Sequence, residues 1–140
     1  MKLVIDASVI LKWFFADEPG ETDTDKARAL LPAAVSGRIA LLQPPHWMVE
    51  VLAVIARRTP TLVDPALTTL GTLGVELVAD EADYRAAAEL SIRLKQHAFD
   101  TLYHAVALKH GAVLVTADER YFTAGRREGS IEMLANFKLA

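Results

Sequence analysis

The stretch MKLVIDASVILKWFF, residues 1–15, opens the chain with a short apolar run that ends in an acidic residue. The run LVI at positions 3–5 does not alternate with polar residues, which predicts a strand that is buried on both faces, as in a parallel sheet. Asp6 comes next, so we expect its carboxylate at the carboxyl end of that strand. A desolvated carboxylate needs a partner, and the only basic residues nearby in the sequence are Lys2 and Lys12.

Strand-like and helix-like segments alternate along the whole chain. Strands are predicted at residues 3–6, 39–43, 74–79, 111–116 and 131–134, and helices at 7–15, 26–35, 46–58, 81–96 and 100–110, with a further helical stretch after Asp64 and Pro65. Strands separated by helices predict right-handed crossovers and a mostly parallel sheet. We therefore expect a three-layer α/β/α sandwich with four to five strands.

One amphipathic segment, residues 81–96, also predicts which side chains face the core. Its apolar spacing places Tyr84, Ala87, Ala88 and Leu94 on the inward face of a helix.

Length and composition indicate a single globular domain over residues 1–140. Hydrophobic residues make up 52% and charged residues 24%, and no apolar stretch has the length of a membrane span. The chain has no cysteine and its first apolar run is too short for a signal peptide, which together predict a cytoplasmic location. The net charge of −3 argues against a broad nucleic-acid-coating surface, although it is compatible with a local basic patch.

Four acidic residues are distributed as if they converge on one site. Asp6 and Asp118 each follow a predicted strand, Asp100 precedes a predicted helix, and Glu50 interrupts the apolar segment WMVEVLAVI. In open α/β sheets, ligands bind outside the carboxyl ends of the strands. Clustered carboxylates raise one another's pKa unless a cation neutralises them. Oxygen-only ligation is typical of Mg²⁺ or Mn²⁺.

Each of these acids also has an ordinary structural interpretation. Aspartate is among the best helix caps, so Asp100 and Asp118 could both be caps. Glu50 is either a partly exposed side chain on an otherwise buried helix or a buried carboxylate held by a cation. The residues alone leave these interpretations open.

Four segments carry the acids in an order that points to one family. These are VIDASVILKWFF, the glutamate after PPHW, FDTLYHAVAL and VLVTADERYF. In order and approximate spacing they resemble the four acidic motifs of the PIN-domain ribonucleases, nearest to the VapC-type toxins of toxin-antitoxin pairs, over nearly the whole chain. The resemblance implies a set of site residues: Asp6, Glu50, Asp100 and Asp118 as the catalytic and metal-binding acids, and Ser8 and Thr116 as hydroxyls that orient a carboxylate or a bound water.

The chain departs from the family pattern at two positions. Many relatives have an asparagine three residues after the helical glutamate, where this chain has Ala53, and a tyrosine where it has Phe99. These departures concern the surroundings of the site rather than its acids.

The resemblance further implies metal-assisted hydrolysis of RNA, with Mg²⁺ or Mn²⁺ as cofactor and a single-stranded or loop region as substrate. It also implies a small antitoxin protein as partner, and a homodimer. Basic residues that could bind phosphate are Lys12, Arg57, Arg58, Arg120, Arg126 and Arg127, most of which we expect to be ordinary solvated surface.

Two other functional classes are weighed against the ribonuclease. A phosphatase of the haloacid-dehalogenase type needs a second aspartate two residues after the first, where this chain has Ser8, and a phosphoacceptor domain needs a lysine after a late strand, where it has TADER. The other class is a catalytically silent PIN-like binding module, which the retention of all four acids argues against.

Histidines and aromatic residues give weaker signals. The four histidines do not form a zinc-binding pair on one helical turn, so we expect structural roles for them, with His104 near enough to Asp100 in sequence to contact the site. The aromatic run at residues 13–15 is either part of a groove for an antitoxin segment or, as we favour, part of the core.

Overall fold

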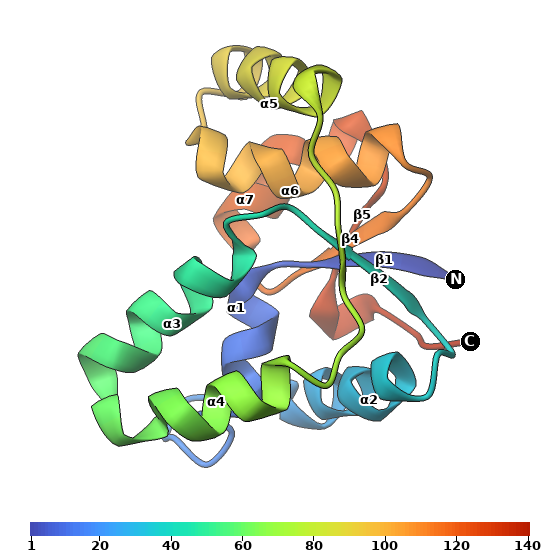
Figure 1. The fold of residues 1–140 in the computed structure, drawn as a ribbon. Coiled ribbons are helices and arrows are strands. Elements are labelled where there is room, and N and C mark those ends of the chain that lie inside the picture. Colours follow the sequence, from blue (N-terminus) through green and yellow to red (C-terminus); the bar gives the residue numbers. More distant parts are fainter.

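The computed structural model describes residues 1–140, and its centre is a five-stranded sheet (Figure 1). Its strands are β1 (Lys2–Ile5), β2 (Ala40–Gln43), β3 (Glu76–Leu77), β4 (Val113–Thr116) and β5 (Ile131–Met133). They lie in the order β3-β2-β1-β4-β5, and every neighbouring pair is parallel. The predicted parallel sheet is confirmed. β3 is shorter than predicted because it lies at the sheet edge, where it pairs with β2 alone and both its residues are exposed.

Helices cover both faces of this sheet and complete the three predicted layers. They are α1 (Ala7–Ile10), α2 (Thr24–Val35), α3 (Trp47–Arg58), α4 (Val63–Leu70), α5 (Glu81–Leu94), α6 (Ala98–Lys109) and α7 (Glu119–Gly125). In Figure 1, α6 lies over one face of the sheet with α5 outside it, and α2 and α4 lie on the opposite side. None of the helices combines the length and apolar composition needed to cross a membrane.

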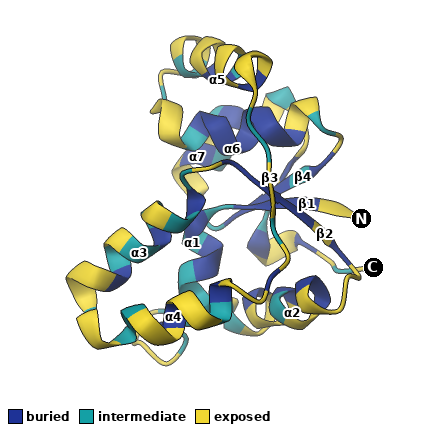
Figure 2. Cartoon of the chain, in the orientation of Figure 1, coloured by how far each residue is buried: buried dark blue, intermediate teal, exposed yellow.

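The strands β1 and β4 form the buried centre of the molecule (Figure 2). Residues 3–5 are fully buried, as the unbroken apolar run predicts. At the end of β1, the buried side chain of Gln43 replaces a backbone partner: its Oε1 accepts from the Ile5 amide at 2.7 Å and its Nε2 donates to the Ile5 carbonyl at 2.9 Å. This pairing fixes the backbone immediately before Asp6.

The inward face of α5 differs from the prediction. Ala87 is buried as expected, but Tyr84 and Ala88 are exposed, and Asp83 and Leu90 are buried instead. The reason is that α5 packs on α6 through a narrow stripe at positions i, i+4 and i+7, so only one side of its apolar face is covered.

The aromatic run after α1 packs into the protein. Phe15 belongs to the core, with the Arg58 guanidinium 4.1 Å above its ring, and the indole of Trp13 donates to the Ala27 carbonyl of α2 at 2.6 Å. Phe14 is partly buried against the same core. The core interpretation of these residues is therefore correct.

Candidate active site

The four acids belong to four different elements at one edge of the sheet. Asp6 follows β1 and is the N-cap of α1, and Asp118 follows β4 and is the N-cap of α7. Glu50 lies in the first turn of α3 and Asp100 in the first turn of α6. All four thus lie at helix N-termini, where the helix dipole favours negative charge.

The carboxylate of Asp6 is held by the two hydroxyl residues that the sequence places beside it. Its Oδ2 accepts from the Ser8 hydroxyl, from the Ser8 amide at 3.3 Å and from the Thr116 hydroxyl at 3.2 Å. Those hydroxyls in turn accept from the next loop: Ser8 Oγ from the Ala117 amide at 3.1 Å and Thr116 Oγ1 from the Asp118 amide at 3.0 Å. The chain segments that follow β1 and β4 are therefore joined through one carboxylate.

No cation balances the charge of Asp6. Burial raises its pKa, the Ser8 hydroxyl opposes that effect, and the nearby Asp100 and Glu50 raise the pKa further, to about 6 in total. Lys12, one of the two basic residues close in sequence, pairs instead with Glu21 at 2.8 Å. The carboxylates of Asp6, Asp100 and Glu50 therefore repel one another.

Glu50 is partly exposed, yet both its oxygens have partners. Its side chain is 27% exposed; Oε2 accepts from the Tyr103 hydroxyl at 3.1 Å and Oε1 lies 3.3 Å from His46 Nε2. Burial and the neighbouring carboxylates raise the pKa of Tyr103, so its hydroxyl stays protonated as a donor. Glu50 is thus partly exposed, as one of the two interpretations expects, and its nearest basic side chain is the imidazole of His46.

Tyr103 and His46 were missed from the sequence, although a signal was present. Tyr103 lies three residues after Asp100 on α6, and His46 lies four residues before Glu50. Residues at these spacings share one face of a helix. A polar residue one helical turn from each acid is therefore the sequence signal for both.

Asp100 is not a helix cap. α6 begins two residues earlier, with His97 at the N-cap, so Asp100 is the third residue of the helix and the predicted start at 100 is wrong. Burial raises its pKa, and the charges of Glu50 and Asp118 raise it further. The capping interpretation of Asp100 is therefore wrong.

Asp118 does act as a cap, as its position after a strand predicts. Its Oδ1 accepts from the Tyr121 amide at 3.0 Å. It also lines a polar cleft of about 330 Å³ together with Asp100. Three cationic or titratable side chains line the same cleft: Lys95, His97 and Arg120. Of the basic residues proposed from the sequence, Arg120 lies here, whereas Lys12 and Arg58 are engaged elsewhere.

The donor chemistry of the acids fits a divalent cation, although their present spacing does not. Carboxylate and hydroxyl oxygens are the ligands that Mg²⁺ and Mn²⁺ prefer. No three acidic or histidine side chains lie close enough together to bind one ion. Binding of one ion by three of these side chains would therefore require them to draw together.

The predicted structural role of His104 is confirmed. The residue is fully buried; its Nδ1 lies 2.9 Å from the Tyr121 hydroxyl and its Nε2 lies 2.7 Å from the Gly129 carbonyl. It joins α6 to the segment after α7 and contacts none of the four acids.

Comparison with known proteins identifies the family of this chain. The family model described as PIN domain matches residues 3–126. This chain belongs to the PIN domain family. The phosphoacceptor and dehalogenase-like alternatives are thereby excluded, because the PIN domain match covers the segments from β1 to α7.

Solved structures share the fold of this PIN domain. One is described as the crystal structure of VapBC2 from Rickettsia felis bound to a DNA fragment from their promoter; the matched chain has a TM-score of 0.64 and 13% sequence identity, over 95% of this chain and 98% of that chain. The comparison with curated proteins gave no significant match.

Proposed function

We propose that this protein is a metal-dependent endoribonuclease that hydrolyses RNA phosphodiester bonds. One observation carries the proposal: four carboxylates, Asp6, Glu50, Asp100 and Asp118, come from four elements to one edge of the sheet, and none forms an ion pair with a lysine or arginine. Uncompensated acids in a PIN domain are suited to hold Mg²⁺ or Mn²⁺.

The protein's own groups have distinct tasks in such a reaction. The hydroxyls of Ser8 and Thr116 hold one oxygen of Asp6, and Tyr103 orients Glu50. A bound divalent ion would supply an activated water and stabilise charge on the phosphate. No side-chain nucleophile is needed.

The polar cleft beside Asp100 and Asp118 is the proposed path of the RNA backbone. Lys95 and Arg120 on its wall can contact phosphate oxygens, and they can do so without reading sequence. The small number of cations fits a short contact with single-stranded RNA rather than a long duplex footprint.

The test is cleavage of total cellular RNA by the purified protein, with Mg²⁺ and with EDTA. We expect fragments with Mg²⁺ and none with EDTA. Asp118→Asn, purified in the same way, is the control for contaminating nuclease, because asparagine caps α7 as well as aspartate does while the metal-binding charge is lost. Unchanged cleavage in EDTA would contradict the metal mechanism. An inactive wild type would leave the silent binding module as the better description.

We further propose that the protein is the toxin of a toxin-antitoxin pair. Its fold is similar to a chain of the VapBC2 structure, and its unpaired carboxylates offer charge-assisted hydrogen bonds to a basic side chain of an inhibitor. The native protein purified from its host should carry a small partner that blocks RNA cleavage. A native preparation that is active and free of any small partner would contradict the assignment.

A homodimer is proposed from the family resemblance. Light scattering at micromolar concentration should give twice the mass of the chain, and a monomer under those conditions would count against it.

A further inference from the structure

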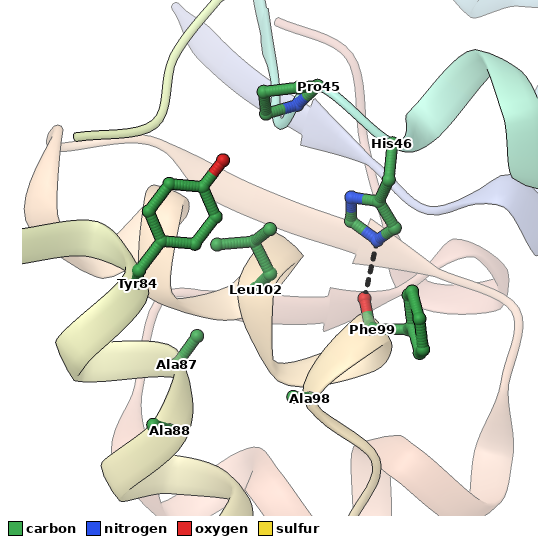
Figure 3. Close-up of a pocket in the computed structure, with 8 residues that line it drawn as sticks. All are labelled: Pro45, His46, Tyr84, Ala87, Ala88, Ala98, Phe99 and Leu102. Atoms are coloured by element: carbon green, nitrogen blue, oxygen red, sulfur yellow. Dashed lines mark hydrogen bonds between the residues drawn. The ribbon is translucent and has the colours of Figure 1, made fainter. Parts of the chain in front are cut away.

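An apolar pocket adjoins the acidic site on the opposite side of the α6 N-terminus from the polar cleft. Its volume is about 300 Å³. Aromatic rings of Tyr84, Phe99 and His46 line it, together with small or apolar side chains of α5 and α6 (Figure 3). Tyr84 is 51% exposed and Phe99 66% exposed, so both rings are accessible to a ligand that enters the pocket.

The pocket and the acidic site share a wall. His46 Nε2 donates to the Phe99 carbonyl at 2.7 Å and lies 3.3 Å from Glu50. Phe99 immediately precedes Asp100, so the first turn of α6 has one side in the pocket and the other in the polar cleft. A ligand in the pocket would therefore lie against the first turn of α6, which carries Asp100, and against His46, which contacts Glu50.

One polar atom in the pocket wall is unsatisfied. His46 Nδ1 is buried and has no hydrogen-bond partner. Figure 3 shows this nitrogen turned toward the side of the pocket where Tyr84 and Leu102 lie. Nε2 donates to the Phe99 carbonyl, which leaves Nδ1 as the ring nitrogen that is free to pair with a ligand. Buried polar atoms without partners are rare, and a polar group of a bound ligand would provide the missing partner.

We propose that this pocket binds one unstacked nucleobase of the RNA substrate, next to the phosphate that is cut. The inference rests on the proposed ribonuclease function and names how its substrate is held. Aromatic rings stack on bases of any sequence, every nucleobase has hydrogen-bonding groups on its edge that can pair with His46 Nδ1, and the neighbouring cleft takes the phosphate. The apolar lining with one polar group is typical of a pocket for a small planar ligand.

The test uses two pocket variants and a matched control. Tyr84→Ala removes a stacking ring, and Ala88→Trp fills the pocket from the same helix. Ile92→Trp adds the same bulk one turn further along α5, at a side chain that is 80% exposed and outside the pocket. The probes are fluorescein-labelled RNA decamers of adenosine, cytidine or uridine, and binding is measured by anisotropy in EDTA, where no cleavage occurs.

We expect both pocket variants to weaken binding of the decamers on the order of tenfold, as loss of one base stack does, and the control to stay within about twofold of wild type. With Mg²⁺, the KM for single-stranded RNA should rise in the pocket variants while kcat changes little. Equal binding by wild type and both variants, or no binding by wild type, overturns the inference.

Two further outcomes distinguish a base-binding pocket from a ribonuclease site and from a dimer contact. If wild type binds the decamers in the expected pattern but cleaves no RNA with any metal, the ribonuclease proposal fails and the base-binding pocket stands. If the pocket variants leave RNA binding unchanged but turn a dimer into a monomer by light scattering, a second copy of the chain occupies the pocket and the inference is wrong.

Discussion

Two aspartates in this protein have opposite surroundings. Asp83, 1% exposed near the start of α5, accepts from the Asp80 amide at 3.0 Å in a reciprocal capping box, and His110 Nε2 lies 2.9 and 3.1 Å from its two oxygens. Asp6 receives hydrogen bonds from Ser8 and Thr116, but its other neighbours include Asp100 and Glu50.

The difference separates a structural acid from a functional one. The carboxylate of Asp83 is fully partnered and ties the start of α5 to the end of α6. Asp6 has hydrogen bonds but no counter-charge. Its negative charge therefore destabilises the metal-free fold and would attract a cation. The charge of the neighbouring side chains is what separates the two roles.

The largest expected effect is on catalysis. Asp6→Asn should slow RNA cleavage at least about 100-fold, the scale seen when one catalytic electrostatic group is removed. Asp83→Asn should cleave within about threefold of wild type, because Asp83 lies on α5 and contacts none of the four acids. Initial rates on one RNA substrate with Mg²⁺ provide the comparison. Similar losses in the two variants would break the distinction.

The next effect is on stability, where we expect the Asp83 variant to lose more than the Asp6 variant. Asp83→Ala should lower the free energy of unfolding by about 2 kcal/mol, because it breaks the capping box and removes the carboxylate that pairs with His110. Asp6→Ala in EDTA should cost less, since the lost hydrogen bonds are offset by relief of repulsion. Urea unfolding of both variants near pH 7 measures the difference. A larger loss for Asp6→Ala would contradict this.

The pH dependence of the metal-free protein gives a smaller, signed effect. The pKa of Asp6 rises from an unfolded value of 3.8 to about 6 in the fold. Its protonation therefore stabilises the fold fully below about pH 4, and that contribution is lost as pH rises through 6. Asparagine does not titrate, so the variant does not lose this contribution. In EDTA, the free energy of unfolding of Asp6→Asn should therefore rise relative to that of wild type by about 2 kcal/mol between pH 4 and pH 7. Urea midpoints across this range measure the gain, and a constant difference would refute the assigned cause.

Much of the fold was predictable because its determinants are local. The apolar runs before Asp6 and Asp118 specify buried strands, and the helices between them require parallel pairing. The limits of β3 were not predictable, because pairing at a sheet edge is decided by the neighbouring strand. The start of α6 was missed because its N-cap, His97, makes no capping hydrogen bond, so there was no sequence signal for it.

The site was predictable in its residue types more than in its geometry. The isolated Glu50 and the two acids after strands identified the edge where they meet. That Glu50 is held by Tyr103 and His46, and that Tyr84 lines a pocket instead of facing the core, depend on how α5 and α6 pack against each other. Such contacts between elements are set by tertiary packing and not by the periodicity of either helix.

We propose that the four acids repel one another at this edge of the sheet and that a divalent cation relieves the repulsion. Thermal melts of wild type and Asp100→Asn, each in EDTA and in Mg²⁺ at one pH near 7, test it most directly. In EDTA the variant should melt about 3 °C higher, because one repelling charge is gone. On addition of Mg²⁺ it should gain less than wild type, because stabilisation by a ligand follows its affinity for the fold. Identical melting temperatures for the two proteins in both conditions would contradict the claim.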